Sequence, residues 1–335
     1  MNRITAFAFT AFTLIFGGNV AQAQAAPPGY HVIKKIPIVG DGGWDYLTVD
    51  SEARRLYIAR SNRVQVVDLE TEKLVGEIEK TPGVHGVAIV PKRDRGFSSN
   101  GGDSTVTVFD LKTLKELSKI KVGSRPDAII YDAASGRVFT FNAGEGDCTA
   151  IDAETEKVVG TVKLGGKPEF PAVDGKGTVF VNIEDKNEII AFDAKDLTIK
   201  HHWPLAPATE PTGLAIDPVK KHLFSCCHSE HMAVIDFETG KVIATPPIGK
   251  GTDAAAFDPE TGLAFSSNGE GTLTVVRQND KGEFEVAETV KTQPGARTMA
   301  LDPKTHKIYL AAATPKAGQR RAIEPGSFVI VVVGK

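Results

Sequence analysis

The sequence contains little of what usually identifies an enzyme or a membrane protein. Its 335 residues include 3 cysteines, 3 methionines and 2 tryptophans, and the formal net charge is −3. No segment matches the phosphate-binding pattern GxxxxGK(S/T), the nucleophile elbow GxSxG or the zinc pattern HExxH, which excludes those three catalytic frameworks. The small negative charge argues against a general binder of nucleic acid or of anionic lipid, because such proteins need a basic face.

Long apolar runs are absent outside the N-terminal segment. A cationic start that ends at Arg3 precedes the apolar run Ile4–Phe16, and small residues then offer cleavage sites near Ala23 or Ala25. This pattern predicts a secretory signal peptide over residues 1–25, with an apolar run too short to span a bilayer. We therefore expect a periplasmic or secreted protein without a membrane span.

A unit repeated seven times dominates the rest of the chain. Apolar runs ending in Asp recur every 40 to 44 residues, at Asp50, Asp132, Asp174, Asp217, Asp258 and Asp302, with Val90 in the second copy. A parallel series ends at Asp68, Asp110, Asp152, Asp193 and Asp236, and finally at Arg277. A fixed period near forty residues with four short strands is typical of β-propeller blades. The sequence therefore predicts an all-β fold, a single seven-bladed propeller over residues 26–335.

The repeats also predict how the ring closes. In the fifth repeat, strands are expected over Gly213–Asp217, His222–Cys227, Met232–Asp236 and Lys241–Ile248. The last repeat supplies only three strands, Met299–Asp302, Lys307–Ala311 and Phe328–Val333. The segment His31–Val39 resembles the missing fourth strand, so an N-terminal strand is expected to complete the seventh blade and to leave no open sheet edge.

These features resemble a known family. The Asp-ended runs, the IY or VF second strands, the turns DAETEKVVG and DFETGKVIA and the closing strand GSFVIVVVGK are similar to those of the YVTN-repeat, YncE-like propellers. The resemblance covers residues 30–335. It implies an exported bacterial protein of seven blades, but the family's molecular roles are diverse, so it implies shape and location more than chemistry.

One face of the predicted propeller gathers polar loop residues around the mouth of the central channel. At equivalent positions before the innermost strands stand Asp45, His85, Asp127, Glu169, Thr212, Asp253 and Arg297, and loops between second and third strands add Arg60, Asn100, Asn142 and Asn268. We take this face, apart from Thr212, as the candidate ligand-binding site of a monomeric binding or scaffold protein. Its partner would be a protein or a small molecule.

The same face admits an enzymatic interpretation. Converging carboxylates either raise each other's pKa values or recruit a cation, and Asp127, Glu169 and Asp253 are the candidate ligands of a calcium or magnesium ion. In a metal-dependent hydrolase or lactonase such an ion would polarise a carbonyl or activate water, with His85 as a candidate general base. In the simpler interpretation these loop residues are polar because they are wet, and Arg297 neutralises part of the cluster.

The segment Cys226–His231 is a second candidate site. Cys227, His228 and His231 carry the thiolate and imidazole groups that copper and zinc prefer. Alternatively, the adjacent cysteines form a vicinal disulfide, or they are small buried apolar residues of a strand. The odd cysteine number leaves at least one thiol unpaired, and a bridge from Cys148 would have to skip a blade.

The long loop Ala313–Pro325 is a third candidate. It carries Lys316, Arg320 and Arg321, and long loops on a rigid scaffold often build or cover binding sites. It is expected to act either as a basic lid that orients an anionic ligand or simply as a mobile insertion.

Overall fold

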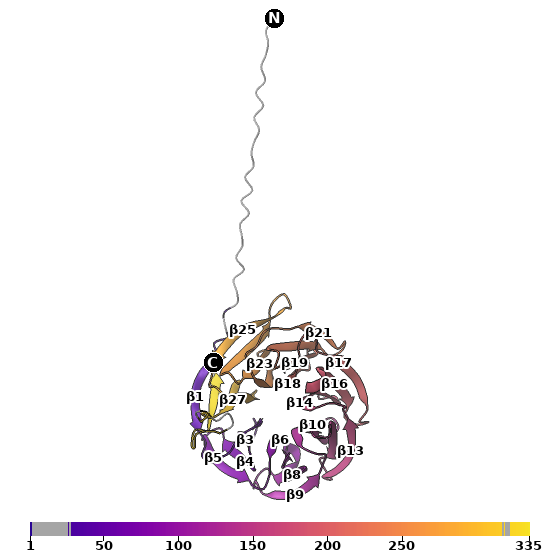
Figure 1. Ribbon diagram of the computed structural model, residues 1–335, viewed down its shortest axis with the longest axis vertical. Helices are drawn as coiled ribbons and strands as arrows, with labels where there is room; N and C mark the ends of the chain where they lie inside the picture. The colour runs from indigo at the N-terminus through magenta and orange to yellow at the C-terminus, as the bar shows by residue number, and fades with distance from the viewer. Residues whose placement is uncertain (2–25, 27, 317, 319–321) are drawn as a thin grey trace.

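The computed structural model describes residues 1, 26, 28–316, 318 and 322–335. Its strands form seven four-stranded antiparallel sheets arranged around one central axis (Figure 1). This arrangement confirms the predicted all-β seven-bladed propeller. The expected signal peptide, apart from Met1, lies outside the described residues.

Each of the first four blades uses consecutive strands, counted from the channel outward. Blade 1 contains β2 (Leu47–Asp50), β3 (Arg55–Arg60), β4 (Arg63–Asp68) and β5 (Lys73–Ile78). Blade 2 contains β6 (Val84–Val90), the short 3-10 helix η1 (Pro91–Arg93), β7 (Arg95–Asn100), β8 (Thr105–Asp110) and β9 (Glu116–Lys121). Blade 3 contains β10 (Pro126–Asp132), β11 (Arg137–Asn142), β12 (Asp147–Asp152) and β13 (Lys157–Lys163). Blade 4 contains β14 (Pro168–Val173), β15 (Thr178–Ile183), η2 (Glu184–Lys186), β16 (Glu188–Asp193) and β17 (Ile199–Pro204).

The remaining blades continue the pattern until the ring closes. Blade 5 contains β18 (Pro211–Asp217), β19 (His222–Cys227), β20 (His231–Asp236) and β21 (Lys241–Ala244). Blade 6 contains β22 (Thr252–Asp258), β23 (Leu263–Asn268), β24 (Thr272–Gln278) and β25 (Phe284–Lys291). Blade 7 contains β26 (Thr298–Asp302), β27 (Lys307–Ala312), β28 (Val329–Gly334) and, outermost, β1 (His31–Pro37).

The seventh blade joins the two ends of the chain. Strand β1 pairs antiparallel with β28, from His31 opposite Gly334 to Pro37 opposite Val329. This register confirms the predicted closure by an N-terminal strand. Several predicted strand ends shift by one or two residues, and the largest error is in β21, which ends at Ala244 rather than at Ile248. The reason is local, because Pro246 and Pro247 have no N–H to donate to a ladder.

The recurrent Asp residues shape turns. The carboxylate of Asp50 accepts a hydrogen bond from the backbone N–H of Ala53 at 2.9 Å, at the end of β2. In the second series, Asp68 accepts from the N–H and the hydroxyl of Thr71 at 2.7 and 2.9 Å, and these bonds lower its pKa. Asp side chains that bond the backbone two or three residues ahead are a standard way to fix a tight turn. The repeat that identifies the fold is therefore mainly turn chemistry.

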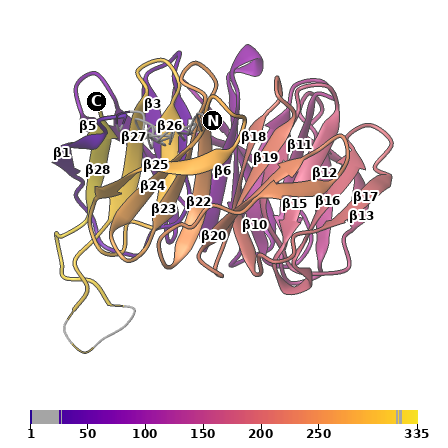
Figure 2. The same cartoon turned by 90° about the horizontal axis from the view of Figure 1, so that it is seen from above.

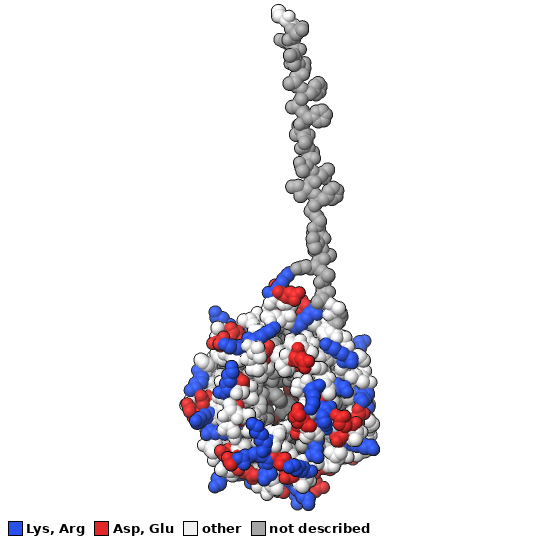
Figure 3. All heavy atoms as spheres, turned by 180° about the vertical axis from the view of Figure 1, so that it is seen from behind, with Lys and Arg blue, Asp and Glu red and all other residues white. Residues whose placement is uncertain are grey.

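The hydrophobic core lies between the blades. Seven clusters of buried apolar side chains each join one pair of neighbouring blades, with fully buried rings such as Phe97, Phe139, Phe180 and Phe265. Such packing fixes the innermost strands rigidly around the channel. Figure 3 shows a hollow at the centre of the face turned away in Figure 1, with basic and acidic side chains interspersed around it. Within the described part of the chain, no helix is long and apolar enough to cross a membrane.

Candidate functional site

The innermost strands bring six of the predicted mouth residues to equivalent places around the channel. Four of them, His85, Asp127, Glu169 and Asp253, are each the second residue of an innermost strand. Arg297 directly precedes β26, and Asp45 lies two residues before the start of β2. The face is the one from which the blade 7 loop projects, at the lower edge of Figure 2. Thr212, at the fifth of the seven equivalent positions, is buried, and its hydroxyl donates to the Cys226 and Thr252 carbonyls.

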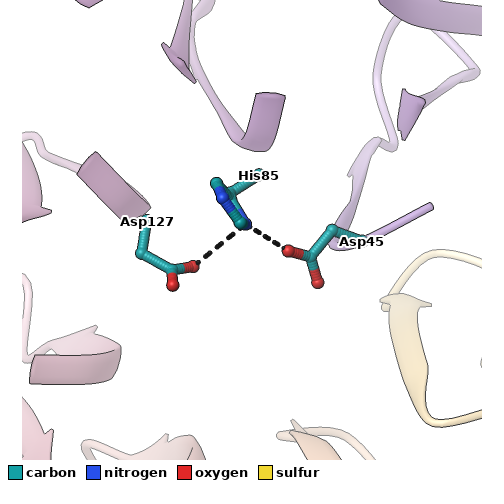
Figure 4. A group of neighbouring side chains, drawn as sticks. All are labelled: Asp45, His85 and Asp127. Carbon is teal, nitrogen blue, oxygen red and sulfur yellow. Dashed lines mark hydrogen bonds and ion pairs between the residues drawn. The ribbon is translucent and has the colours of Figure 1, made fainter. Parts of the chain in front are cut away.

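Three of these side chains form a compact group (Figure 4). The imidazole Nδ1 of His85 lies 2.5 Å from Oδ2 of Asp45 and 3.5 Å from Oδ1 of Asp127. The two carboxylates thus approach the same ring nitrogen from blades 1 and 3, the two blades on either side of blade 2. The backbone behind them is fixed, because the carbonyl of Asp45 accepts the hydroxyl of Thr298 at 2.9 Å.

A second ion pair lies next to Asp45 in the ring. The Nε of Arg297 donates to Asp253 at 2.8 Å, and its NH2 lies 4.0 Å from Asp45. The guanidinium also lies over the ring of Trp44, 5.6 Å from the centroid. Arginine is thereby both paired and stacked, which limits its freedom.

A third cation holds Glu169. Lys167 lies 2.7 Å from Glu169 and also forms an ion pair with Glu184. Glu169 and Lys167 are two residues apart on extended chain, so their side chains share a side of the strand. Asp45, Glu169 and Asp253 are therefore each in close contact with a cationic side chain of the protein. Among the four acids, Asp127 lies farthest from its nearest cationic side chain.

The pKa values of four ring residues are raised above their ordinary values. Burial raises the pKa of Asp127 and of Asp253 to about 6 and that of Glu169 to about 8, with further elevation by neighbouring carboxylates. Burial also lowers the pKa of His85, but the Asp45 hydrogen bond and the charges of Asp127 and Glu169 outweigh it and raise the value to about 9. Near neutral pH the ring therefore contains carboxylates, a protonated Glu169 and three cations side by side.

Below the polar ring, two aromatic side chains meet across the channel. The ring of Tyr46, from blade 1, packs edge-on against Phe170 of blade 4, with centroids 4.9 Å apart. Tyr46 is only 6% exposed, and among the described residues its hydroxyl has no hydrogen-bond partner. Beyond this pair lies an apolar cavity of about 340 Å³, lined by residues that include Leu47, Ile129 and Met299. We call the polar side chains of the mouth, together with this aromatic pair, the cup, and the pair its floor.

Other predicted binding residues lie inside the blades. Arg60 is fully buried, with its guanidinium 3.6 Å from the Phe328 ring centroid and NH2 donating to the Gly40 carbonyl at 2.6 Å. Three asparagines are likewise fully buried and donate to residues of their blade's next loop and strand, namely Asn100 to Thr105 and Thr107, Asn142 to Asp147 and Thr149, and Asn268 to Thr272 and Thr274. These four residues, which the sequence analysis assigned to ligand binding, are therefore buried and form contacts within the protein.

The structure does not assemble the Cys/His segment into one site. Cys226 and Cys227 are free thiols and fully buried, whereas His228 and His231 are exposed. Nδ1 of His231 bonds to the carbonyl of Ser229, and burial raises the pKa of Cys227 to about 11. The vicinal disulfide is absent, and the two cysteines are buried residues of β19. Of the expected calcium or magnesium ligands, Glu169 forms an ion pair with Lys167 and Asp253 forms one with Arg297.

The blade 7 loop projects from the mouth face, and backbone hydrogen bonds join the described parts of its two arms. Lys316 N–H donates to Ala322 and Glu324 N–H donates to Thr314, both at 2.8 Å. Arg320 and Arg321, on which the basic-lid interpretation depended, lie outside the described residues.

Sequence reasoning missed the floor of the cup and the Lys167 cation. The residues that follow the seven mouth positions are Tyr46, Gly86, Ala128, Phe170, Gly213, Ala254 and Thr298. Two of these seven residues are aromatic and the other five are small. This contrast could have predicted the floor, because only large rings can meet across a channel. Lys167 was detectable from its two-residue spacing to Glu169.

Comparisons with known proteins agree with this architecture. The family model described as PQQ_2, outer membrane protein assembly factor BamB, matches residues 102–321. Because the match spans well over half of the sequence, the chain belongs to this family of PQQ-type repeats. No curated protein matches it. Among solved structures, hydrazine synthase of Kuenenia stuttgartiensis is similar, with a TM-score of 0.71 and 16% identity over 82% of this chain and 94% of that chain. At that identity the likeness concerns the fold alone.

Proposed function

We propose that the protein is a monomeric binding or scaffold protein that captures its partner in the cup at the channel mouth. The observation that carries the proposal is the Tyr46–Phe170 contact, which closes the mouth into a cup walled by polar groups from several blades. Concave sites with a few converging polar groups over apolar walls are the usual form of ligand pockets. The family supports the same role, since its description names an assembly factor rather than a catalyst.

The charges of the cup define the kind of ligand. Carboxylates and cations alternate around the wall, and the Tyr46 hydroxyl is a free donor and acceptor. A purely cationic ligand would meet Arg297 and Lys167, and a purely anionic one would meet Asp45 and Asp127. The complementary ligand is therefore zwitterionic or polar and neutral, either a small molecule or the tip of a loop on a protein partner.

We also propose that the chain is exported and belongs to the YVTN-type subgroup of such repeats. The N-terminal pattern Arg3, Ile4–Phe16 and Ala23 supports export. N-terminal sequencing of the protein from the periplasm or medium tests this, because a start after Ala23 or Ala25 is expected. Retention of Met1 in the cytoplasm would contradict it.

The binding proposal is tested on mature, chelator-treated protein with a thermal-shift screen of amino acids, short peptides and sugars, followed by calorimetry. Asp127→Asn and Arg297→Gln should each weaken the binding of a true ligand at least about tenfold, because each leaves a polar group of the bound ligand without its partner. The matched control is Glu52→Gln, an exposed carboxylate in the loop after β2, on the other face. Ligands that bind both mouth variants as well as the original protein would refute the cup as the site.

The Asp45–His85–Asp127 group supports a second candidate, a metal-dependent hydrolase or lactonase. In such an enzyme a cation at the mouth polarises the substrate carbonyl or activates water. Nδ1 of His85 faces both carboxylates, so only its Nε2 is left to act as a base. Turnover of lactones and aryl esters, abolished by chelation and by Asp127→Asn, is the expected result. Metal-independent or absent turnover across the screen would remove this candidate.

A further inference from the structure

We propose that Asp45, His85 and Asp127 form a binding site for one divalent transition-metal ion, for which zinc is the appropriate probe. The inference rests on the proposed use of the channel mouth as the binding site, and it assigns a metal to that site. It replaces the ligand set expected from the sequence, in which Asp127 was grouped with Glu169 and Asp253.

The first observation is the convergence of three ligand atoms. One carboxylate oxygen of each Asp and a ring nitrogen of His85 all lie within 4.8 Å of one another. A zinc ion bound at about 2.0–2.2 Å from each ligand needs ligand atoms roughly 3–3.5 Å apart. The observed nitrogen-to-oxygen separations of 2.5 and 3.5 Å bracket that spacing, so small side-chain rotations suffice.

The second observation concerns what the empty group leaves unsatisfied. A single proton on Nδ1 makes a full hydrogen bond to Asp45, but Asp127 at 3.5 Å is beyond ordinary hydrogen-bond distance. A metal ion in place of that proton bonds all three groups at once, and the proton passes to the solvent. The two carboxylates come from different blades, so the bound ion would join blades 1 and 3 through His85 of blade 2.

The third observation concerns Tyr46, which directly follows Asp45. Tyr46 is 94% removed from solvent and carries a hydroxyl without a partner among the described residues, and that hydroxyl lies in the field of Asp127, Asp253, Glu169 and Asp45. Its oxygen is not among the described side-chain atoms that are both fully buried and without a partner, so it keeps some contact with solvent. The hydroxyl is therefore available to bond to a metal-bound water.

The chemistry of the donors selects the class of metal. One imidazole nitrogen and two carboxylate oxygens suit zinc and its first-row neighbours, whereas calcium and magnesium prefer oxygen alone. Three protein ligands leave a coordination position free, which distinguishes a site that binds a ligand or substrate from a closed structural site. Neither Lys167 nor Arg297 contacts Asp127, so a cation can reach that carboxylate without displacing either of them.

The test uses untagged mature protein, treated with chelator and then titrated with zinc chloride by calorimetry. One equivalent should bind, and cobalt substitution should give the intense visible absorption of a low-coordinate site. Asp127→Asn and His85→Gln should weaken zinc at least about tenfold, by analogy with the loss seen when even the outer partners of metal ligands are removed. Tyr46→Phe should retain zinc but alter the cobalt spectrum.

Two matched controls decide the assignment. Asp253→Asn removes a carboxylate from the same ring, and His231→Gln removes an exposed imidazole from the other candidate segment, and both should bind zinc within about threefold of the original protein. Equal loss in Asp253→Asn would show diffuse attraction by the acidic ring and overturn the site. Absence of a stoichiometric zinc ion would overturn it as well. Because ligand capture is measured in chelated protein, failure of the metal site leaves the binding proposal separately testable.

Discussion

Tyr46 and Phe170 come from blades 1 and 4, yet their rings meet edge-on with centroids 4.9 Å apart and planes at 68°. They occupy the same position in their repeats, one residue after Asp45 and Glu169 respectively. Edge-to-face aromatic pairs of this kind are worth about 0.5–1.5 kcal/mol beyond their burial. The contact therefore ties opposite sides of the ring together while it separates the polar cup from the apolar cavity below.

Replacing Tyr46 with Ala should open the floor of the cup. We expect the free energy of unfolding to fall by roughly 1–3 kcal/mol, less than for a closed core because water can enter the space. Tyr46→Phe is the control, since it keeps the ring and removes only the hydroxyl. Urea denaturation of both variants measures the difference. Equal losses would show that the hydroxyl, not the ring contact, provides the stability.

The stability of the protein should fall as the pH rises from about 4 to about 8. Glu169 keeps its proton up to about pH 8 in the folded state, whereas an unfolded Glu loses it near pH 4.3. The folded state thus binds more protons in this window, so deprotonation opposes folding. His85, with its pKa raised to about 9, extends the decline to higher pH. Denaturation curves of the original protein and of Glu169→Gln between about pH 5 and about pH 9 test the effect. The variant should show the flatter profile, and identical profiles would contradict the assignment.

Arg60 should be dispensable for folding provided that its volume is retained. Burial lowers its pKa to about 10, and its Nε and NH1 have no hydrogen-bond partner. Replacement of a buried charge by an apolar side chain of similar size is often neutral or stabilising. We expect Arg60→Met to change the free energy of unfolding by less than about 1 kcal/mol, and Arg60→Ala to lower it by about 2–4 kcal/mol because a cavity remains. A large loss in Arg60→Met would reveal that the guanidinium itself holds blades 1 and 7 together.

Asp302 should be one of the least replaceable side chains. It is fully buried and accepts Arg54 NH1 and Ser51 Oγ, both at 2.6 Å, which links blade 7 to blade 1. Asp302→Ala removes the buried one of the two carboxylates that pair with Arg54, and breaking a buried pair costs about 3–5 kcal/mol. Glu70→Ala, which removes only the exposed partner of Arg54, should cost less than about 1 kcal/mol. Melting temperatures of the two variants provide the comparison.

The three thiols should be inert in the folded protein. Burial raises the pKa of Cys148 well above its ordinary value and that of Cys226 to about 12, so little thiolate forms at neutral pH. A thiol reagent should therefore label none of them under native conditions and all three in denaturant. Only one labelled thiol after unfolding without reductant would indicate that Cys226 and Cys227 are bridged.

The sequence predicted the propeller because its evidence is local and repeated. Asp50 and Asp68 fix turns through bonds to residues two or three positions ahead, so the pattern can be recognised in the linear sequence. The site was predicted less well, because it depends on side-chain direction. Asp45, His85 and Asp127 were found from their equivalent positions, but Arg60 and Asn142, which end β3 and β11, have fully buried side chains. Nothing in a linear pattern distinguishes an Asn that bonds its own blade from one that faces a ligand.

The pairing of His31 with Gly334 has a consequence for how the molecule reaches its folded state. The strands of blades 1 to 6 meet neighbours that are close in sequence, and they can form as the chain becomes available. The last sheet needs both ends of the chain, and contacts of such large sequence separation form slowly. A chain lacking its final residues would hold an open arc with a bare β27 edge. Ring closure is thus expected to be the rate-limiting step of folding. The same pairing of the two chain ends is expected to determine how slowly the closed molecule unfolds.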